Sequence, residues 1–196
     1  EKGDHDIGRL SRLRWLESNV GLEGDVYPPY APLTLSKTSR EISTWGHTFV
    51  IGPEGLPSRI RFGKEEILER PITLRGRCNN AKIRWEATEA AITNAMPDHV
   101  CWSGHARDGE LALAIEGRIE FDGCAVIDTV LEADHTAQID DLALVISWRK
   151  AHATLATGMG YRGRRNGNLT CSHSIYQSSF SPAVWMGSVQ TGLGWL

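Results

Sequence analysis

The fold is decided by one stretch of alternating residues, Leu111-Ala112-Leu113-Ala114-Ile115-Glu116-Gly117-Arg118-Ile119-Glu120-Phe121-Asp122-Gly123. Its large apolar residues occupy odd positions, and its even positions carry small or charged residues. This period of two is typical of a strand with one buried face. The Asp122-Gly123 pair predicts a type I′ hairpin turn, because that turn needs a positive φ at both central residues. We therefore expect a hairpin whose second strand runs from Cys124 to Ala133.

The same alternation extends outward in both directions. Trp45, His47, Phe49 and Ile51 share one face of a predicted strand, the turn Gly52-Pro53-Glu54-Gly55 follows, and Leu56 to Phe62 forms the return. A later strand places four residues inward: Leu142, Leu144, Ile146 and Trp148. Residues 81–96 permit either a helix or a strand.

Successive strands with polar outer faces predict antiparallel sheets that bury their apolar faces against each other. Only Ser11 to Leu16 has helical spacing, followed by the stop signals Asn19 and Gly21. The predicted fold class is therefore all-β, a two-sheet antiparallel β-sandwich with a short N-terminal helix.

Length and composition limit the class of protein. The 196 residues are 41% hydrophobic, carry a net charge of −3 and suit a single domain over residues 1–196. The slight acidity argues against a nucleic-acid partner, and no uncharged run is long enough to span a membrane. The chain begins without Met and ends on the apolar pair Trp195-Leu196. We expect it to be a fragment of a longer protein.

Metal and cofactor sites are not expected. The four cysteines, Cys78, Cys101, Cys124 and Cys171, lack zinc-site spacing, and free thiols, buried at Cys101 and Cys124, are favoured over a disulfide. His99, Cys101 and His105 share one strand face, but no fourth ligand lies near them in the sequence. The glycine-rich run 158–163 lacks the GK[ST] motif of a phosphate loop.

No residue is assigned a catalytic role. Hydrolysis by paired acids needs two carboxyl groups at a set separation. Asp140 and Asp141 point to opposite faces of an extended segment, and Glu116 and Glu120 alternate with Arg118 on what we interpret as a solvated strand face.

Tryptophan side chains are the remaining candidates for ligand contact, because aromatic rings stack on the apolar faces of sugars. The candidates are Trp45, Trp102, Trp185 and Trp195. Trp on a strand face is also ordinary sandwich core. Trp45, Trp185 and Trp195 are retained as possible contacts to carbohydrate or to another domain.

Several short blocks resemble one family of large proteins. They are Arg12-Leu13-Arg14-Trp15-Leu16-Glu17-Ser18, Pro28-Pro29-Tyr30-Ala31-Pro32, Gly55-Leu56-Pro57, Gly117 to Gly123, Val184-Trp185-Met186-Gly187 and Gly192-Leu193-Gly194-Trp195. In this order and spacing the blocks resemble glycoside-hydrolase-like proteins related to glycoside hydrolase family 123, the β-N-acetylgalactosaminidases.

The resemblance implies an N-terminal β-sandwich that precedes a catalytic (β/α)₈ barrel. In that family the barrel carries an adjacent Asp-Glu pair, and the acetamido group of the substrate acts as nucleophile. No position of this chain matches that pair. The implied role is a non-catalytic support domain, with the barrel as intramolecular partner, the glycan substrate bound through the parent protein, and secretion or a periplasmic location favoured.

Two other functions remain open. A free-standing carbohydrate-binding module would bind glycans through an exposed row of Trp side chains. A purely structural adhesion-type sandwich would have neither sugar affinity nor a barrel partner.

Overall fold

The computed structural model describes residues 24–158, 161–165, 184–189 and 191–195 of the chain. The described part is built from antiparallel strands, and its helical segment is one 3-10 turn, η2 (Lys150–His152). The predicted all-β class is confirmed. The helix predicted over Ser11 to Leu16 lies outside the described residues.

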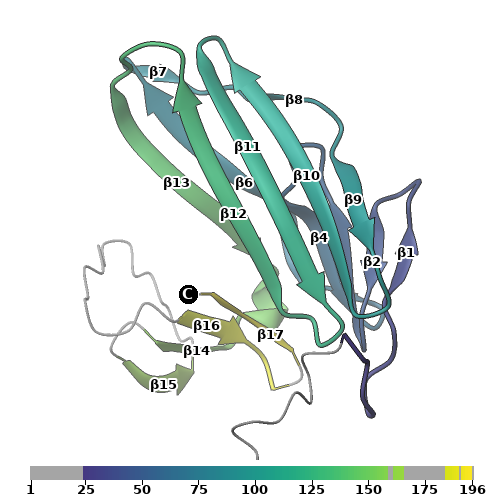
Figure 1. Cartoon of the computed structure of the whole chain (residues 1–196). Coiled ribbons are helices and arrows are strands. Elements are labelled where there is room, and N and C mark those ends of the chain that lie inside the picture. The colour runs from purple at the N-terminus through teal and green to yellow at the C-terminus, as the bar shows by residue number, and fades with distance from the viewer. Residues whose placement is uncertain (1–23, 159–160, 166–183, 190, 196) are drawn as a thin grey trace, which may run out of the picture.

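The strands form four antiparallel sheets, which Figure 1 shows as two long layers with a smaller sheet at one end. Their bounds are β1 (Thr34–Ser36), β2 (Glu41–Ser43), β3 (His47–Ile51), β4 (Pro57–Phe62), β5 (Glu65–Glu66), β6 (Leu68–Cys78), β7 (Ala81–Lys82), β8 (Glu86–Ala87), β9 (Ala91–Ala95), β10 (His99–Asp108), β11 (Leu111–Glu120), β12 (Ala125–Ala133), β13 (Ile139–Trp148), β14 (Leu155–Gly158), β15 (Tyr161–Arg165), β16 (Val184–Gly187) and β17 (Gly192–Trp195). The segment whose structure the sequence left open therefore forms the short strands β7, β8 and β9.

The front layer is one sheet in the order β12-β11-β10, with β8 and β9 both paired to β10. The back layer combines the β1–β5 sheet with the β13-β6-β7 sheet. The two parts of this layer meet where the backbone N–H of Ile67 donates to the carbonyl of Ile60 at 2.8 Å. A fourth sheet, in the order β15-β14-β16-β17, lies across the lower end of the layers in Figure 1, and Leu193 packs against the core from β17.

Strand β11 shows the predicted alternation of buried and more exposed residues. Leu111, Leu113, Ile115 and Ile119 are buried on its inner face, and β12 follows as the predicted hairpin partner. The turn between these strands has a different form from the predicted one: Gly123 has φ +90°, but Asp122 is not in the positive-φ region. Glu120 pairs with Cys124, so the loop has three residues rather than the two of a type I′ turn.

Trp102 joins the two layers. Its ring is 2% exposed, and its Nε1–H donates to the carbonyl of Gly55 at 2.7 Å, across the interior. A Cβ at Gly117, directly opposite on β11, would lie 2.1 Å from the ring. Gly104 is equally constrained, because a Cβ there would lie 2.2 Å from the carbonyl oxygen of Glu54. Both glycines are needed because another part of the chain occupies the space of their side chains.

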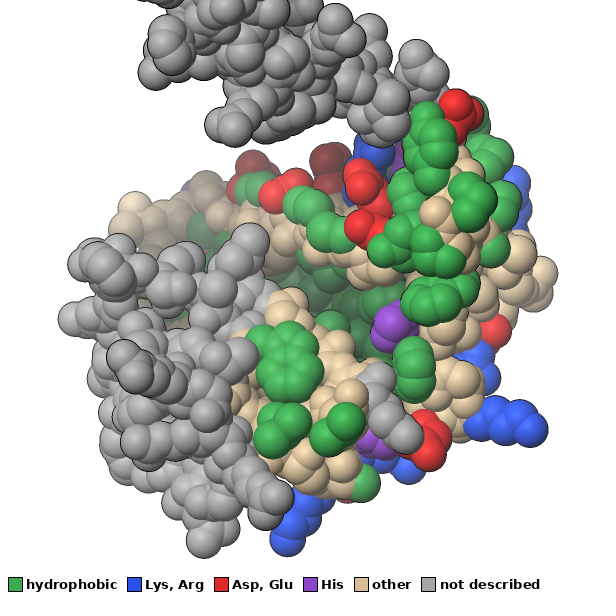
Figure 2. All heavy atoms as spheres, turned by 90° about the horizontal axis from the view of Figure 1, so that it is seen from below, with side chains coloured by type: hydrophobic (Ala, Val, Ile, Leu, Met, Phe, Trp, Pro, Cys, Tyr) green, Lys and Arg blue, Asp and Glu red, His purple; other side chains and the backbone are tan. Residues whose placement is uncertain are grey.

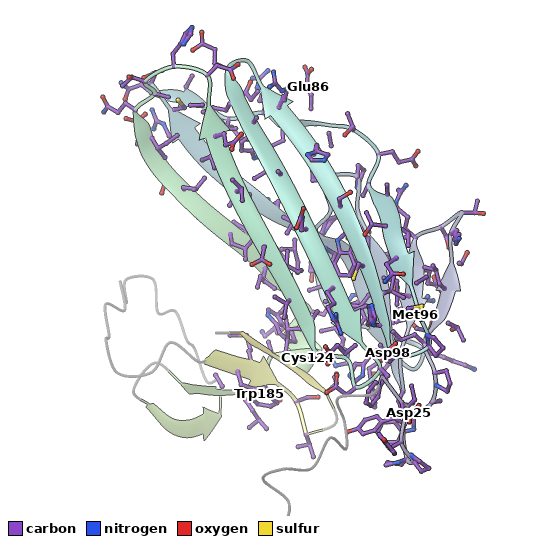
Figure 3. The ribbon with its side chains drawn as sticks, viewed as in Figure 1. Asp25, Glu86, Met96, Asp98, Cys124 and Trp185 are labelled. Atoms are coloured by element: carbon purple, nitrogen blue, oxygen red, sulfur yellow. The ribbon has the colours of Figure 1, made fainter. Side chains whose placement is uncertain are left out.

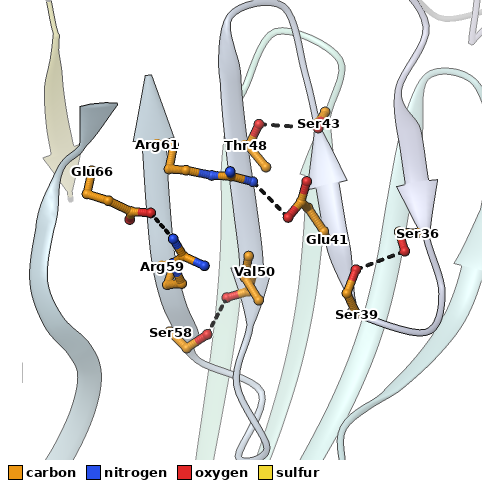
Figure 4. Close-up of polar contacts among 10 residues, drawn as sticks. All are labelled: Ser36, Ser39, Glu41, Ser43, Thr48, Val50, Ser58, Arg59, Arg61 and Glu66. Carbon is orange, nitrogen blue, oxygen red and sulfur yellow. Dashed lines mark hydrogen bonds and ion pairs between the residues drawn. The ribbon is translucent and has the colours of Figure 1, made fainter. Parts of the chain in front are cut away.

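The outer face of the β1–β5 sheet is polar (Figure 4). Arg61 pairs with Glu41 at 2.7 Å, and Arg59 pairs with Glu66 on the neighbouring strand. The Ser58 hydroxyl donates to the carbonyl of Val50 at 3.0 Å. These contacts join strands on the solvent side while Phe49 and Ile51 of the same sheet face the core.

The opposite edge of the sandwich is open. The register of β13 on β6 places Leu144 opposite Leu74 and Leu142 opposite Gly76, on the inner face as the alternation predicts. However, Leu142 is 43% and Leu144 is 56% exposed. The expected burial of these two side chains is therefore wrong, because no described element covers this part of the inner face.

Among the described residues, no helix is long and apolar enough to cross a membrane.

The close contact at Trp102 gives a test of the fold. We expect Gly117→Ala to lower the free energy of unfolding by about 3 kcal/mol, because the added methyl overlaps the Trp102 ring. Gly109→Ala is the matched control: its φ of +58° makes Ala costly, but no atom lies within 4 Å. This variant should lose only about 1 kcal/mol. Urea denaturation of both variants checks this, and equal losses would contradict the packing argument.

Candidate functional site

A cavity of about 660 Å³ lies at the end of the sandwich where three sheets meet. We call it the end cavity. Its walls come from β3 and β4, from the start of β12 and from β17, and they are largely apolar. Residues that line it include His47, Phe49, Asp122, Cys124 and Leu193. Figure 2, which views the molecule from this end, shows hydrophobic side chains gathered beside a hollow.

The turn between β2 and β3 forms one rim of the end cavity. The backbone N–H of Thr44 donates to the carbonyl of His47 at 2.8 Å, so Trp45 and Gly46 form a tight connection. Gly46 has φ +85°, a value that favours glycine at this position of a turn. Trp45 therefore lies in the turn and not on the strand face where the sequence placed it.

The hairpin turn between β11 and β12 lies beside the turn between β2 and β3, because a Cβ at Gly123 would be 3.7 Å from Oγ1 of Thr44, and it also lines the end cavity. The N–H of Gly123 donates to the carbonyl of Glu120 at 2.9 Å, and the N–H of Cys124 donates to Oδ1 of Asp122 at 2.8 Å. The Asp122 carboxylate is thus held by its own turn, as is common for Asp in loops. Phe121 is the first residue of this hairpin turn, directly after the end of β11.

Three rings from distant segments meet beside these turns. Tyr30 lies edge-on to Trp45, with ring centroids 6.0 Å apart, and edge-on to Phe121 at 5.3 Å. We call Tyr30, Trp45 and Phe121 the aromatic cluster. Trp45 remains 56% exposed and Tyr30 40% exposed. The cluster therefore presents apolar aromatic surface to solvent next to the end cavity.

Carboxylates lie at the same end of the fold, where Figure 3 labels Asp25 and Asp98 near Cys124. Oδ2 of Asp98 lies 2.9 Å from Nδ1 of His99, and the carbonyl of Asp98 accepts the N–H of Phe121. The hydrogen bond from His99 is the main cause that lowers the pKa of Asp98 below its ordinary value of 3.8, and the charge of Arg118 acts in the same direction.

A second cavity, of about 470 Å³, lies on the outer face of the front layer. Glu116 of β11 lies directly opposite Asp128 of β12, and both line this cavity with Arg118. Both carboxylates are exposed. In the described strands, the register nevertheless places these two carboxyl groups directly opposite each other on neighbouring strands.

The other tryptophans have structural contacts. Trp102 belongs to the buried core and also lines the second cavity. Trp185 is half-buried on the fourth sheet (Figure 3), where a Cβ at Gly192 would lie 2.3 Å from its ring. The backbone of Trp195 pairs with Val184 in β17, and its side chain lies outside the described part. The ring of Trp45 contacts the ring of Tyr30. Among the described residues, no aromatic contact links Trp45 to Trp185.

The cysteine and histidine candidates do not converge. Cys78, Cys101 and Cys124 are free thiols, and Cys171 lies outside the described residues. Cys124 is exposed at the end cavity, so its expected burial is wrong. His99, Cys101 and His105 lie on the outer face of β10. In the part of the chain that the structure describes, no group of three or more His, Cys, Asp or Glu side chains could hold a metal ion.

Sequence reasoning missed Tyr30, Phe121 and Asp128 as site residues. The signal for Asp128 was the hairpin register, which the sequence defines once the loop length is known. Tyr30 carried no such signal, because it reaches Trp45 through packing between distant segments.

The fold and the site define an all-β sandwich domain with a largely apolar cavity at one end and exposed aromatic rings beside it. The sequence model of the family described as glycoside hydrolase 123, third domain, matches residues 35–195. The chain belongs to this family. Its expected N-terminal position in a parent protein is not confirmed, since the description names a third domain. No curated protein matches the chain.

The lowered pKa of Asp98 predicts a pH-dependent contribution to stability. A pKa below the unfolded value means that this contribution is present above about pH 4 and is lost as the pH falls through the folded-state pKa. Asp98→Asn should therefore lower the free energy of unfolding by on the order of 1 kcal/mol at pH 7, and by progressively less as the pH falls below about 4. Denaturation from pH 2 to 7, with the exposed Asp134→Asn as control, measures this. A gap that stays constant over this pH range would disprove the role of the carboxylate.

Proposed function

We propose that this chain is a non-catalytic domain of a multidomain glycoside hydrolase, and that its open edge packs against another domain of the parent. Membership of the glycoside hydrolase 123 family supports the glycan-processing context. The non-catalytic role is supported by the exposure of the carboxyl groups to solvent. Most glycosidases need one carboxyl group as a general acid and a second as base or nucleophile.

The observation that carries the non-catalytic role is the exposure of Glu116 and Asp128. A glycosidase keeps its general acid protonated by removing it from water. Both of these side chains are exposed on an open sheet face. In the end cavity Asp122 is the carboxylate among the lining residues, and it accepts the N–H of Cys124.

The open edge supports the packing role. Leu142 and Leu144 lie on the inner face of the back layer but are exposed to solvent. Among the described strands, β12 and β13 each pair with one neighbour, so each has an unpaired edge. Exposed apolar side chains at a sheet edge are typical of an interaction surface. An adjoining domain that covers this edge would complete the sandwich core.

Hydrolysis by the purified chain tests the catalytic part of this proposal. We expect aryl N-acetylhexosaminides to be cleaved no faster than in buffer, because no described cavity holds a carboxyl pair removed from water. Glu116→Gln and Asp128→Asn are the diagnostic variants. Hydrolysis that co-purifies with the wild-type chain would overturn the non-catalytic role, and its loss in both variants would assign it to this pair.

Self-association of the isolated chain tests the interaction surface. Leu144→Ser should raise the dissociation constant of self-association about tenfold, because it makes the exposed inner face polar. Val130→Ser is the matched control, since Val130 is 52% exposed on the outer face of β12. Sedimentation equilibrium measures both variants. An equal effect of the two substitutions would argue against a specific surface at the open edge.

A second candidate function is glycan binding by the domain itself. The specific observation in its favour is the aromatic cluster, in which Trp45 keeps more than half of its surface exposed although Tyr30 contacts it.

A further inference from the structure

We propose that the aromatic cluster and the end cavity together bind one end of a neutral glycan, with a pyranose ring stacked on Trp45 and its hydroxyl groups directed to the cavity mouth. The inference rests on the proposed role in a glycoside hydrolase, because that role supplies the class of ligand. The site lies at the end of the sandwich, and Leu142 and Leu144 of the open edge are not among the residues that line its cavity.

The exposed aromatic surface is the first argument. Exposed Trp surface is unfavourable in water, so covering it with a ligand is favourable, and the ring offers a flat apolar face. The C–H face of a pyranose matches that surface. Tyr30 contacts both Trp45 and Phe121, so the cluster is held by its own packing before a ligand arrives. Such preorganisation reduces the entropy lost on binding.

The continuity of the cluster with the end cavity is the second argument. Trp45 lies two residues before His47, and Phe121 directly precedes Asp122; His47 and Asp122 both line the cavity. A volume of about 660 Å³ falls within the usual range for small-molecule sites. A largely apolar wall with few polar groups is the composition expected of such a site.

The charge of the rim is the third argument and defines the kind of glycan. Asp122 is the carboxylate among the residues that line the end cavity, and the N–H of Cys124 fixes it at 2.8 Å. Carboxylates accept hydrogen bonds from sugar hydroxyl groups. They also repel uronic acids and sulfate esters. The rim therefore favours neutral sugars over anionic ones.

Titration of the whole 196-residue chain, followed by ¹H–¹⁵N NMR, tests the inference. The probes are methyl glycosides and trisaccharides of neutral hexoses and N-acetylhexosamines, with tri-galacturonic acid as the anionic comparison. We expect saturable shifts at the Trp45 indole N–H and the Gly123 amide with a neutral probe. Trp45→Ala should weaken this binding about tenfold or more.

The matched control is Leu144→Ala, because Leu144 is as exposed as Trp45 and lies on the open edge. It should leave glycan binding unchanged. Three outcomes would overturn the inference: no binding of any neutral probe, stronger binding of the anionic probe, or binding that Trp45→Ala does not weaken. A Trp45→Ala variant that changes self-association instead would identify the end as a protein contact. None of these results alters the hydrolysis assay, so the proposed non-catalytic role is judged separately.

Discussion

The contact of Trp102 with the opposite layer is the constraint on which the rest of the sandwich depends. The indole donates to the carbonyl of Gly55, so a side chain of the front layer satisfies a backbone group of the loop between β3 and β4. That loop reaches inward because Gly104 leaves room for the backbone of Glu54. Gly117 leaves room for the ring itself. One aromatic side chain and two glycines thus fix how closely the layers approach.

The two layers are packed closely around Trp102 but are not closed at β13. Strands β10 and β11 are held close to the back layer, and their inner residues Val100, Ile115 and Ile119 are buried. Leu142 and Leu144 lie on the inner face of the back layer but stay exposed. Together these features give a sandwich with a well-packed centre, a concave end and one side whose inner face stays exposed.

The sequence predicted the strands and their faces better than it predicted burial or turns. Alternation identified β11 and the inner face of β13, because side-chain direction follows from the period of the strand alone. The exposure of Leu144 was not predictable, because burial depends on what the other layer covers. Tyr30 and Phe121 were missed for the same reason: their contact with Trp45 is tertiary.

The length of the hairpin loop after β11 determines which residues of β12 face the core. A two-residue loop at Asp122-Gly123 would pair Leu113 with Glu132 and direct that carboxylate to the core. The three-residue loop instead pairs Leu113 with Leu131, and Glu116 with Asp128 on the outside. The left-handed Gly123 therefore determines both the apolar interior and the acidic exterior of the sheet.

The distribution of acids on the two free edges has a consequence for the chain in solution. The edge strand β12 carries Asp128 and Glu132, and β13 carries Asp140 and Asp141. Like charges oppose the backbone pairing of one molecule with another at an unpaired strand, and this repulsion weakens when carboxylates are protonated or screened by salt. Strand-to-strand assembly of copies of this chain is therefore most strongly opposed in dilute buffer where the carboxylates are ionised, and it becomes easier toward acid or concentrated salt.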